Sequence, residues 1–192
     1  MKGMMPPHLI VEPPEPKYKR DKDDFFETPA ECTVALLQAE NGAIPIEIWE
    51  PCVGKGAIIK AMPAREWVCT DLVDRGVGTS RRDFLMERKK LADAIITNPP
   101  FKLLYEFIMH AIELDTSYIA ILHPTLFLNT VGWQEIVDRR APRTVYTLTW
   151  RPDLFGIGTP DQRCCLCWSV WDDQHFKAIN RPTIYRTLSR PK

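Results

Sequence analysis

The chain has 192 residues, of which 45% are hydrophobic and 26% charged, which is ordinary for a single globular domain. Its 25 Lys and Arg residues balance 25 Asp and Glu residues, so it lacks the overall positive charge typical of nucleic-acid-binding proteins. No apolar run approaches the length of a transmembrane helix, and the N-terminus lacks the apolar core of a signal peptide. We therefore expect a cytoplasmic protein, of a bacterial or phage-infected host cytosol, without a membrane partner.

The six cysteines lie mostly in apolar runs, where a thiol acts as a small hydrophobe. Reduced thiols fit a cytosolic setting. Cys164, Cys165 and Cys167 form a cluster, but the second pair of Cys or His ligands that a zinc site needs is missing. The spacing favours buried strand packing over metal binding, and we expect no metal site.

Residues 1–24 combine five prolines with a charged stretch, which predicts a disordered or surface-draped tail. Residues 25–192 are expected to form one domain. Basic residues gather at 17–22 and again at 81–90, and for both runs solvated surface is slightly favoured over nucleic-acid contact.

The first expected helix begins after the sequence Thr28-Pro29-Ala30-Glu31. Thr28 is predicted to be its N-cap, Pro29 its first helical residue and Glu31 the returning carboxylate of a capping box. The helix is predicted to end near Gly42.

Short apolar, β-rich segments then alternate with helical ones, which predicts an α/β fold with a largely parallel sheet and helices on both faces. Two late strands are joined by a loop without a helix, which predicts an antiparallel strand at one edge. The expected strands cover residues 44–49, 66–72, 92–97, 117–122, 145–150 and 164–171, and the further helices cover 58–62, 103–112 and 130–139.

Glycines follow the first strand in the sequence Glu50-Pro51-Cys52-Val53-Gly54-Lys55-Gly56. Gly54 and Gly56 allow a sharp turn and a close approach of backbone to a ligand. The loop departs from both the dinucleotide fingerprint and the P-loop, and Glu50 suits a cationic amino group better than a phosphate. Asp71 ends the second strand, where a carboxylate can accept hydrogen bonds from ribose hydroxyls.

Asn98-Pro99-Pro100-Phe101 follows the third strand. The two prolines remove backbone donors and stiffen the turn, so the Asn98 side-chain oxygen and nearby carbonyls remain as acceptors. A planar amino group could donate its two hydrogens to them, and Phe101 could stack on an extruded base. In open α/β sheets ligands bind beyond the carboxyl ends of the strands, where these three segments are expected to meet.

These motifs resemble the S-adenosylmethionine-dependent methyltransferases that act on amino groups, especially small phage-type DNA N6-adenine methyltransferases. The resemblance covers residues 25–172, and Asn98 to Phe101 is similar to the family's (D/N/S)PP(Y/F) motif. It implies a Rossmann-like, seven-stranded class I methyltransferase sheet with a reversed final strand. It further implies S-adenosylmethionine as cofactor and adenine in DNA, flipped out of the helix, as substrate, with RNA also open.

The resemblance also implies roles for individual residues. Asp71 would hold the ribose, and Asp83 and Phe84 would contact the cofactor's adenine, although a helix cap is an equal interpretation of Asp83. Asn98, Pro99, Pro100 and Phe101 would form the catalytic motif. The methionine side of the cofactor would be lined by Phe26, Thr28, Glu50, Cys52, Gly54 and Gly56.

No stretch is long enough for a separate target-recognition domain, so sequence specificity would be slight or would come from loops or a partner. Arg151, Phe155 and Arg163 combine charge with an aromatic ring in one loop and are the candidate nucleic-acid contacts. Three alternatives remain open: RNA adenine as substrate, a protein glutamine as substrate, and an inactive cofactor-binding interaction module. The sequence does not indicate the target sequence or the oligomeric state.

Overall fold

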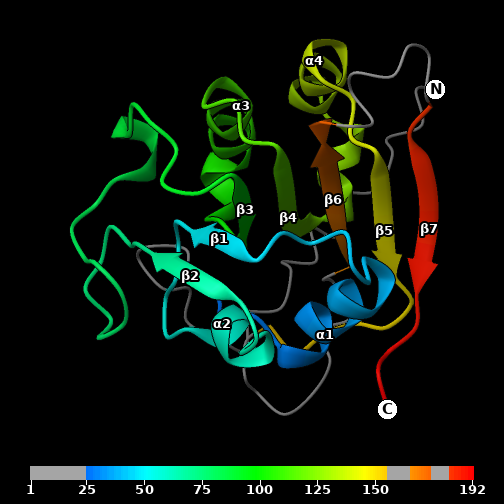
Figure 1. Ribbon diagram of the computed structural model, residues 1–192. Helices are drawn as coiled ribbons and strands as arrows, with labels where there is room; N and C mark the ends of the chain where they lie inside the picture. Colours follow the sequence, from blue (N-terminus) through cyan, green and yellow to red (C-terminus); the bar gives the residue numbers. More distant parts are fainter. Residues whose placement is uncertain (1–24, 155–164, 174–181) are drawn as a thin grey trace, which may run out of the picture.

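The computed structural model describes residues 25–154, 165–173 and 182–192. Their centre is a seven-stranded sheet in the order β2-β1-β3-β4-β6-β5-β7, shown in Figure 1. The strands are β1 (Glu47–Glu50), β2 (Glu66–Cys69), β3 (Ala94–Thr97), β4 (Tyr118–Pro124), β5 (Thr144–Leu148), β6 (Leu166–Asp172) and β7 (Ile184–Leu188). The predicted α/β, Rossmann-like class I methyltransferase sheet is confirmed in its strand number and mixed direction.

The reversed strand occupies a different place from the one predicted. Strand β6 runs antiparallel to both of its neighbours, β4 and β5, and lies inside the sheet. The edge beyond β5 is formed by β7, which pairs parallel to β5 and was not predicted from the sequence. The prediction of an antiparallel edge strand was therefore wrong in position, because β6 lies between β4 and β5 while β7 forms the edge.

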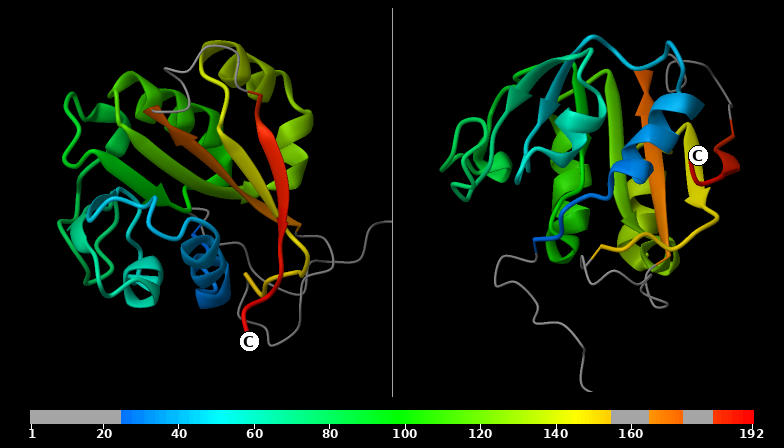
Figure 2. Two further views of the ribbon diagram at one scale, coloured as in Figure 1. Left: turned by 45° about the vertical axis from the view of Figure 1, so that its right-hand side comes forward. Right: turned by 90° about the horizontal axis from the view of Figure 1, so that it is seen from below.

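Helices cover both faces of the sheet, as predicted. Helices α1 (Ala30–Ala39) and α2 (Ala57–Ala61) lie on one face, and α3 (Leu104–Glu113) and α4 (Val131–Arg139) on the other (Figures 1 and 2). Within β3, Ile96 packs into the cluster beneath α1 and α2, whereas Ile95 packs into the cluster with α3 and α4. Burial of both faces explains why this strand is an uninterrupted apolar run.

The predicted capping box at the start of α1 is wrong. The helix begins at Ala30, its N-cap is Pro29, and no side chain caps it. The Thr28 hydroxyl instead accepts a hydrogen bond from the Asn98 side chain at 3.1 Å. A threonine does cap α4, since Thr130 is its N-cap and accepts from the Trp133 N–H.

The predicted tail, residues 1–24, lies outside the described residues, and so does Cys164. Cys167 is fully buried in β6, in line with the expectation of strand packing. No helix in the described ranges is long and apolar enough to cross a membrane.

Candidate active site

A cavity of about 400 Å³ opens at the carboxyl ends of β1, β2 and β3. Its walls come from residues 25–28, which precede α1, from the loop after β1, from residues 71–85 and from the turn after β3. The three motif segments predicted to converge therefore do so. Among the predicted site residues, the cavity is lined by Phe26, Thr28, Glu50, Cys52, Asp71, Asp83, Phe84, Asn98, Pro99 and Pro100.

The glycine turn is fixed to the end of β2 by Asp71. The Gly54 N–H donates to Asp71 Oδ2 at 2.8 Å, and the Val73 N–H donates to Oδ1 at 2.8 Å. Gly54 and Gly56 both have positive φ, +53° and +77°, which L side chains rarely adopt. The two glycines shape the turn, and neither belongs to the lining of the cavity.

Gly54 also makes room for the segment before α1. A Cβ atom at this position would stand 2.5 Å from Cε2 of Phe25. We expect Gly54→Ala to destabilise the fold by about 1–3 kcal/mol, because both φ and this contact oppose a side chain. Urea unfolding of the single variant and of Gly54→Ala with Phe25→Ala measures both costs. In the double variant the clash with the Phe25 ring is absent, so only the cost of the positive φ should remain. If Gly54→Ala were as stable as the wild type, neither the φ nor the contact at Gly54 would be as described.

Glu50 is a buried carboxylate at the end of β1, 2% exposed. Its Oε2 atom has no hydrogen-bond partner among the described residues. Burial raises the pKa of Glu50 well above its usual range, and the nearby Asp71 carboxylate raises it further. A buried carboxylate is costly without a partner, so this one fits a cationic ligand group in the cavity.

Asn98 lies directly after β3 with a defined amide orientation. Its Nδ2 donates to the Phe26 carbonyl at 3.2 Å and to the Thr28 hydroxyl at 3.1 Å. Because a carbonyl oxygen only accepts, the nitrogen must face this segment and the oxygen must face away from it. Asn98 Oδ1 is buried and has no hydrogen-bond partner within the described ranges. It is thus an oriented acceptor in the wall of the cavity.

The rest of the Asn98 motif behaves as a rigid turn. Phe101 begins the short 3₁₀ helix η2 (Phe101–Leu103), in which the Leu103 N–H donates to the Pro100 carbonyl. The Phe101 ring stacks on Phe26, with centroids 5.7 Å apart and planes 25° apart. Phe101 is absent from the lining of the cavity, so in this structure it supports the segment before α1.

Asp83 and Phe84 both have contacts outside the cavity as well. Asp83 Oδ1 accepts from the Leu85 N–H at 3.0 Å and so caps the 3₁₀ helix η1 (Phe84–Met86). The Phe84 ring is 3% exposed and packs edge-on against Trp49. The capping interpretation of Asp83 is therefore confirmed, and both residues still line the cavity.

The sequence did not predict Phe25, Arg75, Lys102 or Leu103 as lining residues. The Arg75 guanidinium lies 4.2 Å from the centroid of the Phe25 ring, joining two segments far apart in sequence. Phe25 adjoins Phe26, and Lys102 and Leu103 follow the Asn98 motif. This adjacency was the only signal in the sequence that could have predicted these three as lining residues. Arg151 is exposed and outside the cavity lining, while Phe155 and Arg163 lie outside the described residues.

No known family model matches the sequence, and no curated protein is significantly similar to it. Solved structures share the fold. A Listeria monocytogenes protein described as a class I S-adenosylmethionine-dependent methyltransferase superposes with a TM-score of 0.63 at 10% identity, covering 90% of this chain and 68% of that one. A type I restriction-modification methyltransferase subunit from Streptococcus thermophilus gives a TM-score of 0.62 at 15% identity, covering 84% of this chain.

The 23S rRNA methyltransferase ErmE gives a TM-score of 0.59 at 10% identity, covering 77% of this chain and 70% of that one. The chain spans about half of the Streptococcus thermophilus subunit, of which 47% is covered. At these identities the likeness concerns the fold alone. The chain therefore has the class I methyltransferase fold, with its cavity at the carboxyl ends of the strands.

Proposed function

We propose that this chain transfers a methyl group from S-adenosylmethionine to the exocyclic N6 amine of adenine in DNA. The observation that carries the proposal is Asn98 Oδ1, a buried acceptor without a protein partner in the described ranges, in the wall of a cavity built on this fold. The proposal draws on structural neighbours that include a restriction-modification methyltransferase subunit and an rRNA methyltransferase.

The residues of the cavity fit the cofactor. Glu50, whose Oε2 is buried without a partner among the described residues, suits the ammonium group of the methionine part. Asp71 is 9% exposed in the cavity wall and would accept from the ribose hydroxyls with lone pairs that its two backbone contacts leave available. Asp83 and Phe84 line the same cavity and would lie against the adenine. When bound, S-adenosylmethionine supplies an electrophilic methyl group on a sulfonium sulfur.

Asn98 would prepare the target amine for attack. The lone pair of this amine is delocalised into the purine ring, which makes it a weak nucleophile. Hydrogen bonds from the amine to Asn98 Oδ1 and to the Pro99 carbonyl would favour a pyramidal nitrogen and stabilise its developing positive charge. Formation of the new N–C bond would be coupled to loss of the bond between methyl group and sulfur, with S-adenosylhomocysteine as the leaving group. The methylated ammonium is acidic and would release its proton to water.

Thr28 would act as a positioning residue through Asn98. In Thr28→Val the hydroxyl that accepts from Asn98 Nδ2 is lost while the side-chain shape is kept, so the orientation of the amide is less restricted. We expect kcat to fall about 3- to 10-fold, the value of one hydrogen bond, with little change in the Kd for S-adenosylmethionine. Thr28→Ser, which keeps the hydroxyl, should retain activity. A raised Kd with unchanged kcat would instead assign Thr28 to cofactor binding alone.

The substrate class is tested with S-adenosylmethionine carrying a tritiated methyl group. Purified protein is incubated with unmethylated DNA, with RNA and with a protein pool, and label is counted in each. We expect incorporation into DNA. Label confined to RNA or to protein glutamine would overturn the DNA assignment, and the absence of cofactor binding in calorimetry would overturn the enzyme assignment.

A further inference from the structure

The chain makes a long excursion between β2 and β3, residues 70–93, beyond the carboxyl ends of β1 and β2 (Figure 1). Its middle is held to the end of β2, since the Thr79 N–H donates to the Cys69 carbonyl at 2.9 Å. The Arg82 N–H donates to the Asp71 carbonyl at 3.0 Å. One side of the excursion, including Val73 and Leu85, lines the cavity. It is therefore a structured wall of the candidate active site.

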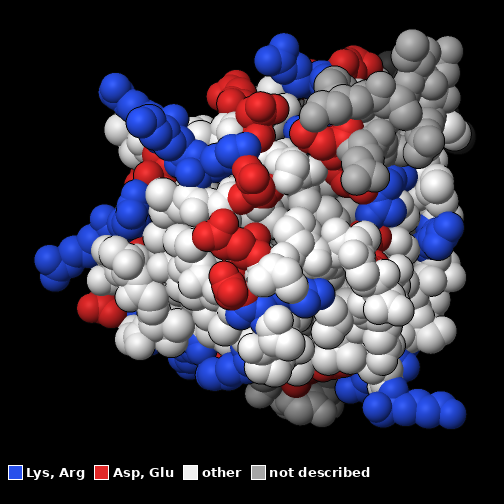
Figure 3. Space-filling view, viewed as in Figure 1, with Lys and Arg blue, Asp and Glu red and all other residues white. Residues whose placement is uncertain are grey.

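Positive charge gathers in the second half of the excursion, in a chain that is neutral as a whole. Residues 81–90 hold five Lys or Arg residues and two Asp or Glu residues, a net charge of +3, whereas the formal net charge of the whole chain is +0. Over the whole connection, residues 70–93, six Lys or Arg residues stand against five Asp or Glu residues. Figure 3 shows Lys and Arg side chains projecting from the margin of the molecule on the side where the excursion lies.

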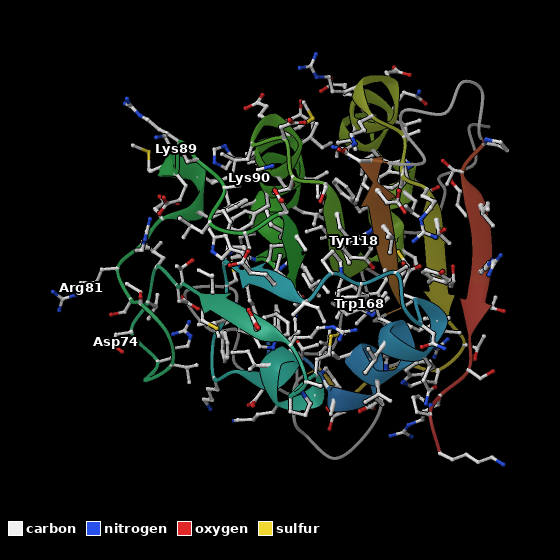
Figure 4. All side chains as sticks on the ribbon, in the orientation of Figure 1. Asp74, Arg81, Lys89, Lys90, Tyr118 and Trp168 are labelled. Atoms are coloured by element: carbon white, nitrogen blue, oxygen red, sulfur yellow. The ribbon has the colours of Figure 1, made fainter. Side chains whose placement is uncertain are left out.

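Arg82 and Lys90 form ion pairs with carboxylates of the described residues. Arg82 donates to both oxygens of Glu87 at 2.7 Å, and Lys90 lies 2.6 Å from Asp93. The exposed residues Arg81, Arg88 and Lys89 have no ion pair among the described residues. Figure 4 shows Arg81 and Lys89 pointing outward from the excursion. These three side chains, Arg81, Arg88 and Lys89, form what we call the basic wall.

The backbone conformation of Arg81 is unfavourable for a residue with a side chain. Its φ is +59°, in the left-handed region that a glycine adopts without strain. An arginine there gives up backbone stability for a cation at the outer rim of the excursion. The same geometry provides a useful variant, because Arg81→Gly removes the charge while relieving the backbone.

We propose that the basic wall binds the phosphate backbone of the nucleic-acid substrate and so positions it over the cavity. This inference rests on the proposed function. A methyltransferase that acts on DNA requires a surface that binds the DNA, and the basic wall would be that surface. Phosphate contacts fix the register of a nucleic acid without reading its sequence. The three exposed cations stand on the excursion, other residues of which, among them Arg82 and Leu85, line the cavity. A neutral chain without such a surface would have little affinity for a polyanion.

The test compares two variants with the same loss of charge in the full chain. Arg81→Gly, Arg88→Gln and Lys89→Gln together neutralise the basic wall. Arg139→Gln, Arg186→Gln and Lys192→Gln neutralise three other exposed cations, two of them on β7 or beyond it, at the opposite edge of the sheet. Fluorescence anisotropy with a labelled duplex DNA, a single-stranded DNA and a duplex RNA is measured across a series of NaCl concentrations.

The wall variant should bind DNA about tenfold or more weakly at low salt, with a log Kd against log salt slope shallower by about 2 to 3. Its KM for DNA should rise, while kcat at saturating DNA and the Kd for S-adenosylmethionine stay near wild type. The control variant should keep at least most of the wild-type slope. Stronger loss for RNA than for DNA would assign the surface to RNA backbone.

Failure of the inference differs from failure of the proposed function. If wild-type protein methylates DNA and the wall variant keeps the wild-type slope and KM, the basic wall is not the docking surface. If wild-type protein neither binds nor methylates any nucleic acid, the proposed function and the inference both fall.

Discussion

Asn98→Ala is expected to lower kcat by about 100-fold or more, while the Kd for S-adenosylmethionine changes little. The variant removes Oδ1, the buried acceptor without a described partner, and with it one preorganised group that stabilises charge on the attacking nitrogen. Single-turnover transfer to DNA measures the methylation step, and calorimetry measures cofactor binding.

The Thr28→Val variant is the matched comparison, because it disturbs the contact of Asn98 with the segment before α1 and leaves the oxygen in place. The loss in Asn98→Ala should exceed the loss in Thr28→Val by tenfold or more. Methyl transfer at the wild-type rate by Asn98→Ala would show that the oxygen has no part in the reaction.

Glu50→Gln is expected to weaken S-adenosylmethionine binding by about 10- to 100-fold, the value of a charge-assisted hydrogen bond. The amide keeps the shape of the side chain and removes its negative charge. Calorimetric titration with S-adenosylmethionine measures the change. Unchanged affinity would exclude Glu50 as the partner of the cofactor's ammonium group.

The same substitution should not lower the stability of the ligand-free protein. Burial raises the pKa of Glu50, so between its unfolded and folded pKa the native state binds more protons than the unfolded state. Stability contributed by this group is therefore present at low pH and is lost as pH rises through the folded pKa. Glu50→Gln should remove this loss, giving equal or higher stability at neutral pH in urea unfolding. A clear destabilisation would show that the carboxylate is satisfied in the protein.

The parts of the fold that the sequence predicted are those encoded locally. The uninterrupted apolar run predicted strand β3, and the apolar residues spaced three and four apart predicted helix α3. Burial of β3 on both faces of the sheet confirms the prediction of a sheet covered on both faces. The position of β6 was misjudged, although its run of buried residues from Leu166 to Trp171 is typical of an inner strand. Which strand lies beside another depends on long-range pairing, as between Thr144 and Ile184, and that pairing leaves no local pattern.

The candidate site followed the same rule. Glu50, Asp71 and Asn98 could be predicted because each lies at or just after the carboxyl end of a strand, and these three strand ends meet. Thr28 was misread as a helix cap because Thr-Pro-x-Glu has the local form of a capping box, whereas its partner is 70 residues away. Phe101 could not be placed from sequence either, since its stacking on Phe26 is a tertiary contact.

The central claim is that the oxygen of Asn98 holds the amine of an adenine. Unmethylated DNA is incubated with the wild-type protein and with Asn98→Ala in the presence of isotopically labelled S-adenosylmethionine, then digested and analysed by nucleoside mass spectrometry. We predict labelled N6-methyl-2′-deoxyadenosine with wild type and at least about 100-fold less with the variant. Label on cytosine, or equal label on adenine with both proteins, would contradict the account.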